Sequence, residues 1–203
     1  MYLTIETLRN KVPSVMTAHE YAKQLRKDEP TVILRNYNEP TSPPHKRKGV
    51  KTLDIAKEKR PKDVRESYGW RQSIPGETVF DAIVAALGPG GYQIFMADSS
   101  YTYYDIYQLY EYLANFDSTN LETWIAEVYD CDDFAEAVNG SANRFLKGIP
   151  HGVLWYGDKA GTWGHAVNIF YCGYYQQVFL LEPQADQFYY FDQENWDAWM
   201  VMI

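Results

Sequence analysis

The pattern of apolar and polar positions divides the second half of the chain into helical segments followed by strand-like ones. In the helical segments apolar residues recur every three or four positions, as Ile106, Leu109 and Leu113 do on one face of an amphipathic stretch. Gly88 and Gly148 supply stop signals after the first and the last of these segments. The pattern predicts helices at 79–87, at 103–114 and from 131 to the stop at 148, with a short helix or turn at 121–128.

Strand-like segments make up most of the chain after the last helix, and turn residues separate them. Within one of them His165, Val167, Ile169 and Tyr171 alternate with other residues and therefore share a face. The predicted strands are 92–96, 152–156, 163–172, 175–181, 187–191 and 199–203. Helices followed by a mostly antiparallel sheet predict an α+β domain, with the helix that begins at Cys131 packed on the sheet.

The first third of the chain differs in charge. Residues 1–75 hold 16 Lys or Arg against 9 Asp or Glu, whereas residues 76–203 hold 3 against 18. We therefore predict a basic N-terminal extension at 1–75, partly flexible, and a separate domain at 76–203. The extension itself contains a short helical pattern at 17–27 and a brief strand-like run at 31–34.

Residues 36–71 are rich in Pro, Lys and Arg and poor in large apolar residues. Such a segment buries little surface and is predicted to be extended or mobile unless a partner orders it. We interpret it as a soluble linker; the alternative is an electrostatic arm that contacts an acidic partner or the acidic half of the same chain. The sequence has no Gly-rich phosphate loop, zinc-type cysteine spacing or nucleic-acid-binding motif, so nucleic acid is not an expected partner.

The composition is typical of a protein with a packed core, because 46% of the 203 residues are hydrophobic and 16% are aromatic. The N-terminus lacks the basic region and long apolar run of a signal peptide, and no stretch reaches the ~20 apolar residues of a membrane helix. We expect a cytoplasmic protein without a membrane partner, with a place in a virion as the alternative. Two cysteines argue against a disulfide scaffold. Cys172, on a predicted strand, is interpreted as a core residue, and a bridge to Cys131 stays open.

Cys131 falls in the first turn of a predicted helix. Asp130 is a good N-cap, and Asp133 at the third helical position suits the positive end of the helix dipole. The unpaired backbone N–H groups of this turn favour a thiolate and can receive an oxyanion. The carboxylates of Asp130, Asp132 and Asp133 oppose a thiolate, so an imidazolium or a cation is expected nearby.

Three later residues could complete the chemistry of a reactive thiol. His165 lies on a predicted strand that can carry a base rigidly to the sulfur. Glu182 ends the next strand before Pro183, where a carboxylate can orient the imidazole, and Gln184 can add an amide donor to the oxyanion site. Taken singly, a buried cysteine, a strand histidine and a Glu-Pro turn are common structural features. Their order along the chain favours the chemical interpretation.

The chain from about Met96 to its end resembles the papain-like C-terminal domain of the Marasmius oreades agglutinin and related stand-alone bacterial and phage papain-like proteins. The matching segments are Ala97-Asp98-Ser99-Ser100-Tyr101, Trp124, Tyr129-Asp130-Cys131-Asp132-Asp133-Phe134-Ala135, Gly164-His165-Ala166-Val167-Asn168, Glu182-Pro183-Gln184 and Trp199-Met200-Val201-Met202-Ile203. The resemblance covers about half of the chain. It implies a papain-like cysteine protease fold in which Cys131 is the nucleophile, His165 the base and Glu182 the third member of the triad.

The same resemblance implies that Trp124 and Gln184 lie beside the sulfur, in the oxyanion or substrate-binding site. Calcium or manganese supports the activity of the agglutinin, which makes Asp132 and Asp133 candidate metal ligands here, although two adjacent acids are also a common solvated helix start. Nothing in residues 1–95 indicates the sugar-binding β-trefoil of the agglutinin. Carbohydrate recognition is therefore not carried over.

These observations favour a papain-like thiol hydrolase that cleaves a peptide or isopeptide bond through a Cys-His-Glu triad. Its partner would be a peptide or protein substrate, and the acidic domain favours a basic one. Two alternatives stay open. The same residues suit a transglutaminase-like or cell-wall amidase activity, and the fold could instead be catalytically silent and serve as a phage structural or host-interaction protein.

Overall fold

The computed structural model describes residues 52–53, 55, 72–125 and 128–203. The helix predicted at 17–27, the strand predicted at 31–34 and most of the basic segment 36–71 lie outside the described residues. No helix in the described part of the chain is both long and apolar enough to cross a membrane.

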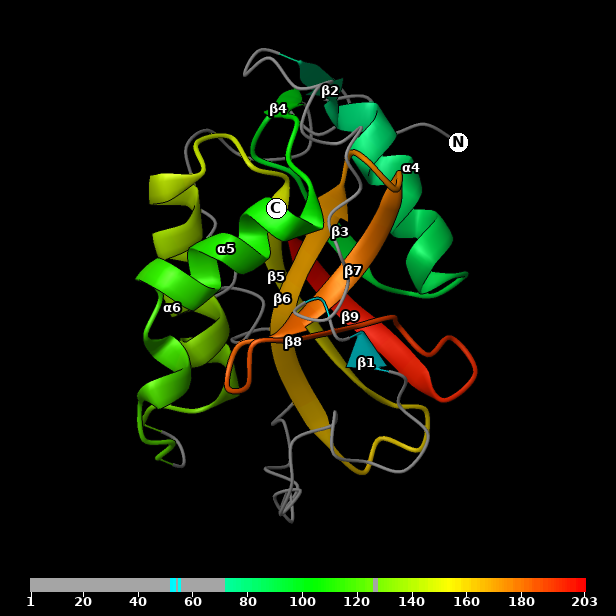
Figure 1. The fold of residues 1–203 in the computed structure, drawn as a ribbon. Helices are drawn as coiled ribbons and strands as arrows, with labels where there is room; N and C mark the ends of the chain where they lie inside the picture. Colours follow the sequence, from blue (N-terminus) through cyan, green and yellow to red (C-terminus); the bar gives the residue numbers. More distant parts are fainter. Residues whose placement is uncertain (1–51, 54, 56–71, 126–127) are drawn as a thin grey trace, which may run out of the picture. The chain divides into compact units, whose positions relative to one another are not determined.

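The described residues form one large sheet, a small two-stranded sheet and a few helices (Figure 1). The helices are α4 (Gly76–Leu87), α5 (Ile106–Phe116), the 3-10 helix η2 (Thr119–Leu121) and α6 (Cys131–Phe145). The strands are β1 (Thr52–Leu53), β2 (Ser73–Pro75), β3 (Gln93–Phe95), β4 (Ser100–Thr102), β5 (His151–Asp158), β6 (Gly164–Cys172), β7 (Gln177–Glu182), β8 (Gln187–Tyr189) and β9 (Trp196–Met202). The large sheet has the order β1-β8-β7-β6-β5-β9-β3, antiparallel except for the β3–β9 pair, and β2 pairs with β4. This is the α+β architecture predicted from the sequence.

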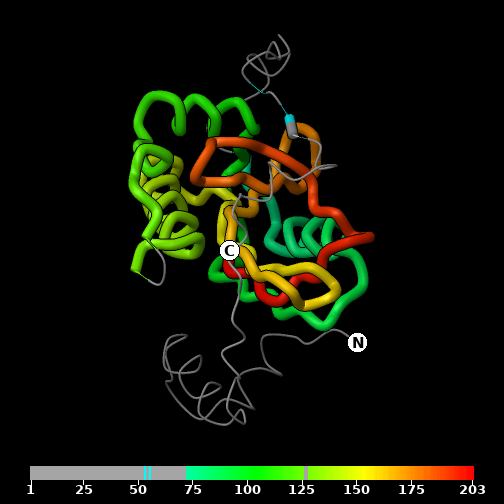
Figure 2. The backbone as a smooth tube through the Cα atoms, turned by 90° about the horizontal axis from the view of Figure 1, so that it is seen from below, coloured from blue at the N-terminus to red at the C-terminus, as the bar shows by residue number. Residues whose placement is uncertain are grey.

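Helices cover both faces of the large sheet. Helices α5 and α6 pack on one face against Phe170, Cys172 and Leu181, while α4 packs on the other against Ile169 and Leu180. Figure 2, turned by 90°, shows the two groups of helices on opposite sides of the central strands. Strand β6 is therefore buried on both faces, which explains why it reads as a nearly continuous apolar run and not as an alternation.

The predicted elements agree with the observed ones except at their ends and in short segments. Helix α5 begins at Ile106 and not at residue 103, because Asp105 caps it: Gln108 N donates to Asp105 Oδ1 at 2.9 Å, and Asp105 N donates to Gln108 Oε1 at 2.9 Å. η2 ends at Leu121 and a bridge pairs Ile125 with Tyr129, which agrees with the turn that was one of the two forms predicted at 121–128. The short strands β1, β2 and β4 were not predicted.

Two pieces of the basic extension belong to these sheets. Thr52–Leu53 pairs with β8 as an edge strand, and the Ile55 side chain is buried in the core beside α5. Ser73–Pro75 pairs with Ser100–Thr102. The boundary between residues 75 and 76 stays a prediction.

Cys172 is a core residue, as expected. It lies in the cluster that packs β6 and β7 against α5 and α6, and burial raises the pKa of its thiol to about 11. Both Cys131 and Cys172 are free thiols, so the alternative of a bridge between them is wrong.

A second buried group, His151 at the start of β5, connects the sheet to α6. Its Nδ1 lies 3.0 Å from Asn139 Oδ1, which also accepts from Asn143 Nδ2 at 2.9 Å, so His151 Nδ1–H is the donor. His151 Nε2 is buried and has no hydrogen-bond partner among the described residues. Burial lowers the pKa of this imidazole from 6.5 to about 3.

Because the folded state keeps His151 neutral while the unfolded chain protonates it below pH 6.5, the unfolded state binds more protons between these two pKa values. We expect the free energy of unfolding to fall by about 2–4 kcal/mol from this group as the pH drops from 6.5 to 4. Urea titrations of wild type and His151→Leu across this pH range measure it. If the free energy of unfolding fell equally with pH in both proteins, the neutral buried state assigned to His151 would be contradicted.

Candidate active site

Cys131 is the first residue of α6 and is partly buried. Asp130 is the N-cap, and the carboxylate of Asp133 accepts from Asp130 N at 3.1 Å. The helix start predicted from the sequence is thus confirmed, including the position of Asp133 in the first turn. The thiol lies where free backbone N–H groups of the turn can reach a negatively charged atom.

Asn168 holds this turn of α6 on the sheet. Its Nδ2 donates to the backbone oxygen of Ala135 at 2.7 Å and to that of Gly152 on β5 at 3.1 Å, and the residue is fully buried. Ala135 lies one turn after Cys131, so Asn168 fixes the height of the thiol above the strands. Sequence analysis missed this role. The available signal was a single amide side chain inside an otherwise apolar strand, where a buried polar group needs partners.

His165 and Glu182 lie together on neighbouring strands. His165 on β6 and Glu182 on β7 are both buried, and His165 Nε2 lies 2.8 Å from Glu182 Oε2. The Cys131 side chain is also close enough to His165 to help raise the pKa of its imidazole. Because Nε2 faces the carboxylate, Nδ1 is the ring nitrogen left for the thiol. The structure thus brings Cys131, His165 and Glu182 together in the order predicted.

The electrostatics of this group favour a charged imidazole. Burial lowers the pKa of His165, but the Glu182 charge and the hydrogen bonds with Cys131 and Glu182 outweigh it and raise the pKa from 6.5 to about 9. At neutral pH His165 is therefore an imidazolium paired with a buried carboxylate. This imidazolium supplies the positive charge that the acidic start of α6 requires.

Two buried tyrosines, missed by sequence analysis, wall off the His165–Glu182 pair from water. Tyr156 is the cross-strand partner of His165, and their rings meet edge to face at 5.9 Å. The hydroxyls of Tyr156 and Tyr189 lie 3.1 Å apart. Burial, together with the nearby Tyr156 and the Glu182 charge, raises the pKa of Tyr189 well above 10. The pair is therefore buried beside aromatic rings, where its electrostatic attraction is stronger than in water.

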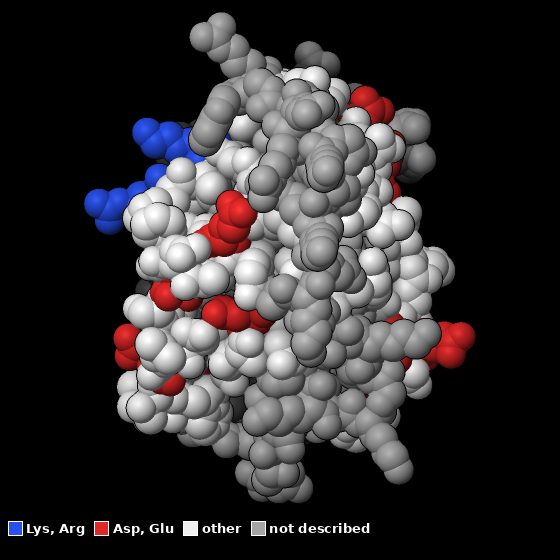
Figure 3. Space-filling model, in the orientation of Figure 1, with Lys and Arg blue, Asp and Glu red and all other residues white. Residues whose placement is uncertain are grey.

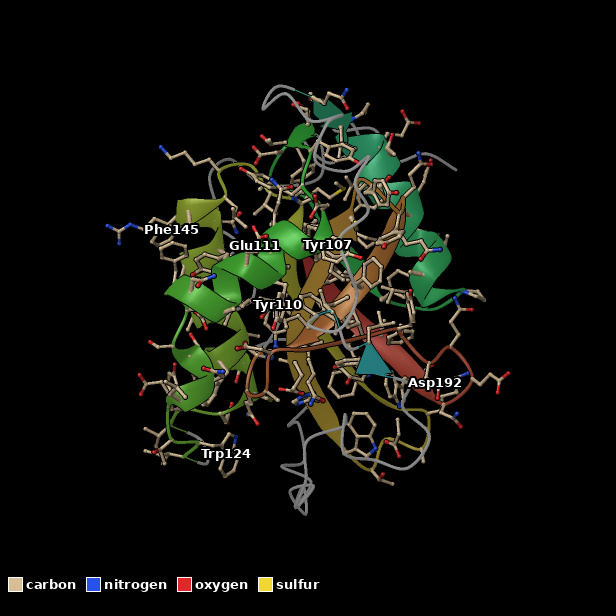
Figure 4. The ribbon with its side chains drawn as sticks, viewed as in Figure 1. Tyr107, Tyr110, Glu111, Trp124, Phe145 and Asp192 are labelled. Carbon is tan, nitrogen blue, oxygen red and sulfur yellow. The ribbon has the colours of Figure 1, made fainter. Side chains whose placement is uncertain are left out.

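The two expected neighbours of the sulfur are placed differently. Gln184 is half-buried and follows Glu182 closely enough for its backbone N to lie 3.4 Å from Glu182 Oε1. Trp124 is 40% exposed, just before the turn closed by Ile125 and Tyr129. Figure 4 shows Trp124 near the end of α6 opposite to Phe145, which is the end where Cys131 lies. The roles of Trp124 and Gln184 in oxyanion or substrate binding stay predictions.

The acidic residues around Cys131 lie in the capping box or beside the sulfur. The carboxylates of Asp130 and Asp133 both take part in the capping box of α6, and one oxygen each from Asp130 and Asp132 and the sulfur of Cys131 lie within 4.8 Å of one another. A hydrogen bond with Asp130, then burial and the Asp130 charge, raise the pKa of Asp132. Two carboxyls this close fit a hard cation such as calcium or manganese. Metal binding stays a prediction, and Asp130 is a better-placed partner for Asp132 than Asp133 is.

The fold is similar to that of the papain-like domains found in fungal lectins. PSL1a in its complex with E64 matches with a TM-score of 0.52 and 20% sequence identity, over 64% of this chain and 51% of that chain. The lectin of Polyporus squamosus, bound to a human-type influenza-binding epitope, matches with a TM-score of 0.54 and 20% identity, over 64% of this chain and 49% of that chain. The chain thus spans about half the length of the solved structures it matches. No protein-family model and no curated protein matches the sequence.

The raised pKa of His165 makes stability fall at alkaline pH. The folded state holds this proton up to about pH 9 while the unfolded chain releases it near 6.5, so the contribution is complete below pH 6.5 and is lost as the pH rises through 9. We expect a loss of up to about 3 kcal/mol over this range in wild type, and little of it in Glu182→Gln. Urea unfolding at several pH values measures it, with Glu77→Gln, an exposed carboxylate, as control. Identical alkaline losses in all three proteins would refute the pairing.

Removing the Asn168 amide should loosen α6 at its start. We expect Asn168→Ala to cost about 1–3 kcal/mol of unfolding free energy, since two hydrogen bonds to buried carbonyls are lost, and to slow the alkylation of Cys131. The matched control is Asn115→Ala, an exposed amide that donates to a carbonyl of its own helix. A variant that is destabilised but keeps the wild-type alkylation rate would mean that Asn168 does not position the thiol.

Proposed function

We propose that this protein is a papain-like thiol hydrolase that cleaves a peptide or isopeptide bond through Cys131, His165 and Glu182. The observation that carries the proposal is the position of His165, whose Nε2 lies 2.8 Å from Glu182 Oε2 and whose pKa is raised by the Cys131 side chain as well as by Glu182. A thiol beside a charged imidazole at a helix N-terminus is the arrangement that activates a cysteine for attack.

Each residue has one task in this mechanism. The thiolate of Cys131 attacks the carbonyl carbon, and backbone N–H groups of the first turn of α6, with Gln184, stabilise the oxyanion. His165 gives its proton to the leaving nitrogen as the C–N bond breaks, which leaves a thioester. His165 then takes a proton from water, the hydroxide attacks the thioester, and the C–S bond breaks to restore the thiolate and the imidazolium. Glu182 keeps the ring oriented throughout.

The similarity to PSL1a supports the reaction class, because that protein forms a complex with E64, an inhibitor of cysteine proteases. If a divalent cation binds, Asp130 and Asp132 would hold it, and its charge would relieve the repulsion between their carboxylates and the thiolate. His165 and Glu182 supply the acid-base chemistry in either case.

The first test is the rate at which iodoacetamide alkylates Cys131, measured from pH 4 to 9 in Cys172→Ala protein so that one thiol remains. We expect rapid alkylation already at pH 6–7, and a rate at least about tenfold lower when His165 is also replaced by Ala. EDTA and calcium form parallel arms. A slow reaction that is indifferent to His165 would sink the proposal and favour the catalytically silent alternative.

Product analysis then separates hydrolysis from transfer. The assay uses peptides from a library that the protein is found to convert. A carboxylic acid product identifies a hydrolase, whereas incorporation of an added amine identifies the transglutaminase-like alternative. Cys131→Ala is the negative control in both assays.

A further inference from the structure

Strand β9 carries an irregularity beside the candidate active site, and it falls at Trp199. Trp155 on β5 pairs with Met200, but the next residue, Tyr156, pairs with Ala198, so Trp199 is an extra residue in this ladder. Such a bulge redirects a side chain, and bulges are common next to active sites. Trp199 is 42% exposed, which is unusual for a tryptophan inside a central strand pair.

Two glycines form the surface on which this indole rests. Gly157 and Gly164 are direct cross-strand partners on β5 and β6. A Cβ at Gly164 would lie 2.6 Å from Trp199 Cη2, and a Cβ at Gly157 would also collide with the indole. The ring therefore packs on bare backbone, and part of it remains open to solvent. Any larger residue at these positions would push it away.

The glycine surface under this indole is one cross-strand step from residues that pack with Cys131. Trp155 and Ala166 are the next cross-strand pair on the same face, about 7 Å along the strands, and they pack in one cluster with Cys131. Gly164 is also the residue immediately before His165. A peptide whose carbonyl reaches the sulfur would therefore pass within side-chain reach of Trp199.

Acidic side chains far outnumber basic ones among the residues that the structure describes. Exposed Asp197 pairs with Gly157 at the edge of the glycine surface, and Asp130 and Asp132 flank the thiol. Only three Lys or Arg residues occur in 76–203. Lys159 donates to the backbone of Gln193, at 2.7 Å. The other two, Arg144 and Lys147, lie at or beyond the end of α6, about 20 Å from its start. Among the described residues in the space-filling view, acidic side chains are scattered over the face shown and basic ones lie at one edge (Figure 3).

We propose that Trp199 forms a substrate-binding wall that receives a lysine or arginine side chain of the peptide substrate. An open indole is the strongest aromatic partner for a cation, and surrounding carboxylates raise the local concentration of positive groups. An apolar substrate side chain would make the same contact with the indole but would lack the electrostatic attraction of a cation to the ring and the carboxylates. The proposal rests on the proposed function and names the substrate class of that same site.

The test uses the full-length Cys131→Ala protein, which binds a peptide without cleaving it. Two blocked alanine pentapeptides are compared, one with a central lysine and one with norleucine, which has a similar chain but no charge. Isothermal titration calorimetry measures the affinity in every variant, and the indole Nε1–H resonance of Trp199, assigned by its loss in Trp199→Phe, shows whether the peptide contacts the indole when Trp199 is present. We expect the lysine peptide to bind about three- to tenfold more tightly, and the preference to disappear at high salt and in Trp199→Ala.

Two further variants complete the design. Trp199→Phe keeps an aromatic face and should retain part of the preference for lysine. Tyr190→Ala removes an aromatic residue of similar exposure, 44%, from the end of another strand and should retain all of it. Equal affinities for the two peptides, or a preference that survives in Trp199→Ala, would overturn the proposal.

This outcome is independent of the proposed reaction. Binding to Cys131→Ala does not require a reactive thiol, whereas the iodoacetamide rate does not require a peptide. If Cys131 is reactive but the protein does not prefer the lysine peptide, the proposed hydrolase function stands and the role of Trp199 as a substrate-binding wall is refuted. If Cys131 is unreactive but the protein still prefers the lysine peptide, the hydrolase proposal is refuted and the binding of basic peptides at Trp199 stands.

Discussion

The two hydrogen bonds from the Asn168 amide hold the rest of the site in register. They connect α6 to β5 through β6, so the helix that carries Cys131 and the strand that carries His165 share one rigid contact. A triad requires its atoms to be held to within about half an ångström, and a helix packed on a sheet by apolar contacts alone can slide. A buried amide with directional partners removes that freedom, because any slip would leave carbonyl or amide groups unpaired in the core.

The same constraint explains why a charged pair can be buried nearby. Removing His165 and Glu182 from water is costly, and their attraction offsets the cost only when the geometry is held. Rigid walls from Tyr156 and Tyr189 supply that geometry and exclude the water that would screen the pair. His151 shows the opposite outcome in the same domain, since an imidazole buried without a carboxylate partner remains neutral. Partner chemistry, more than burial, decides the charge of each histidine.

Local signals were enough to predict the α+β fold, the helix start at Cys131 and the strand ends that carry His165 and Glu182. Apolar spacing, capping residues and the Glu-Pro strand end are all encoded within a few residues. Contacts between distant segments were not predictable in this way. The two hydrogen bonds of the Asn168 amide, the register shift at Trp199 and the glycine pair beneath Trp199 all depend on strand pairing. No local pattern in the sequence specifies that pairing. The sequence left a short helix and a turn open at 121–128, because short apolar runs suit both alike, and the bridge between Ile125 and Tyr129 agrees with the turn.

The edge strand β1 has a consequence for the solubility of the folded domain. β8 would otherwise present unpaired N–H and C=O groups at the open edge of a large sheet, a surface on which another chain can add a strand. Thr52–Leu53 occupies that edge, and Ile55 fills the adjoining apolar hollow. Thr52–Leu53 thus protects this edge of the sheet from edge-to-edge aggregation, and a version of the chain that begins after residue 55 would lose this protection while keeping every residue of the site.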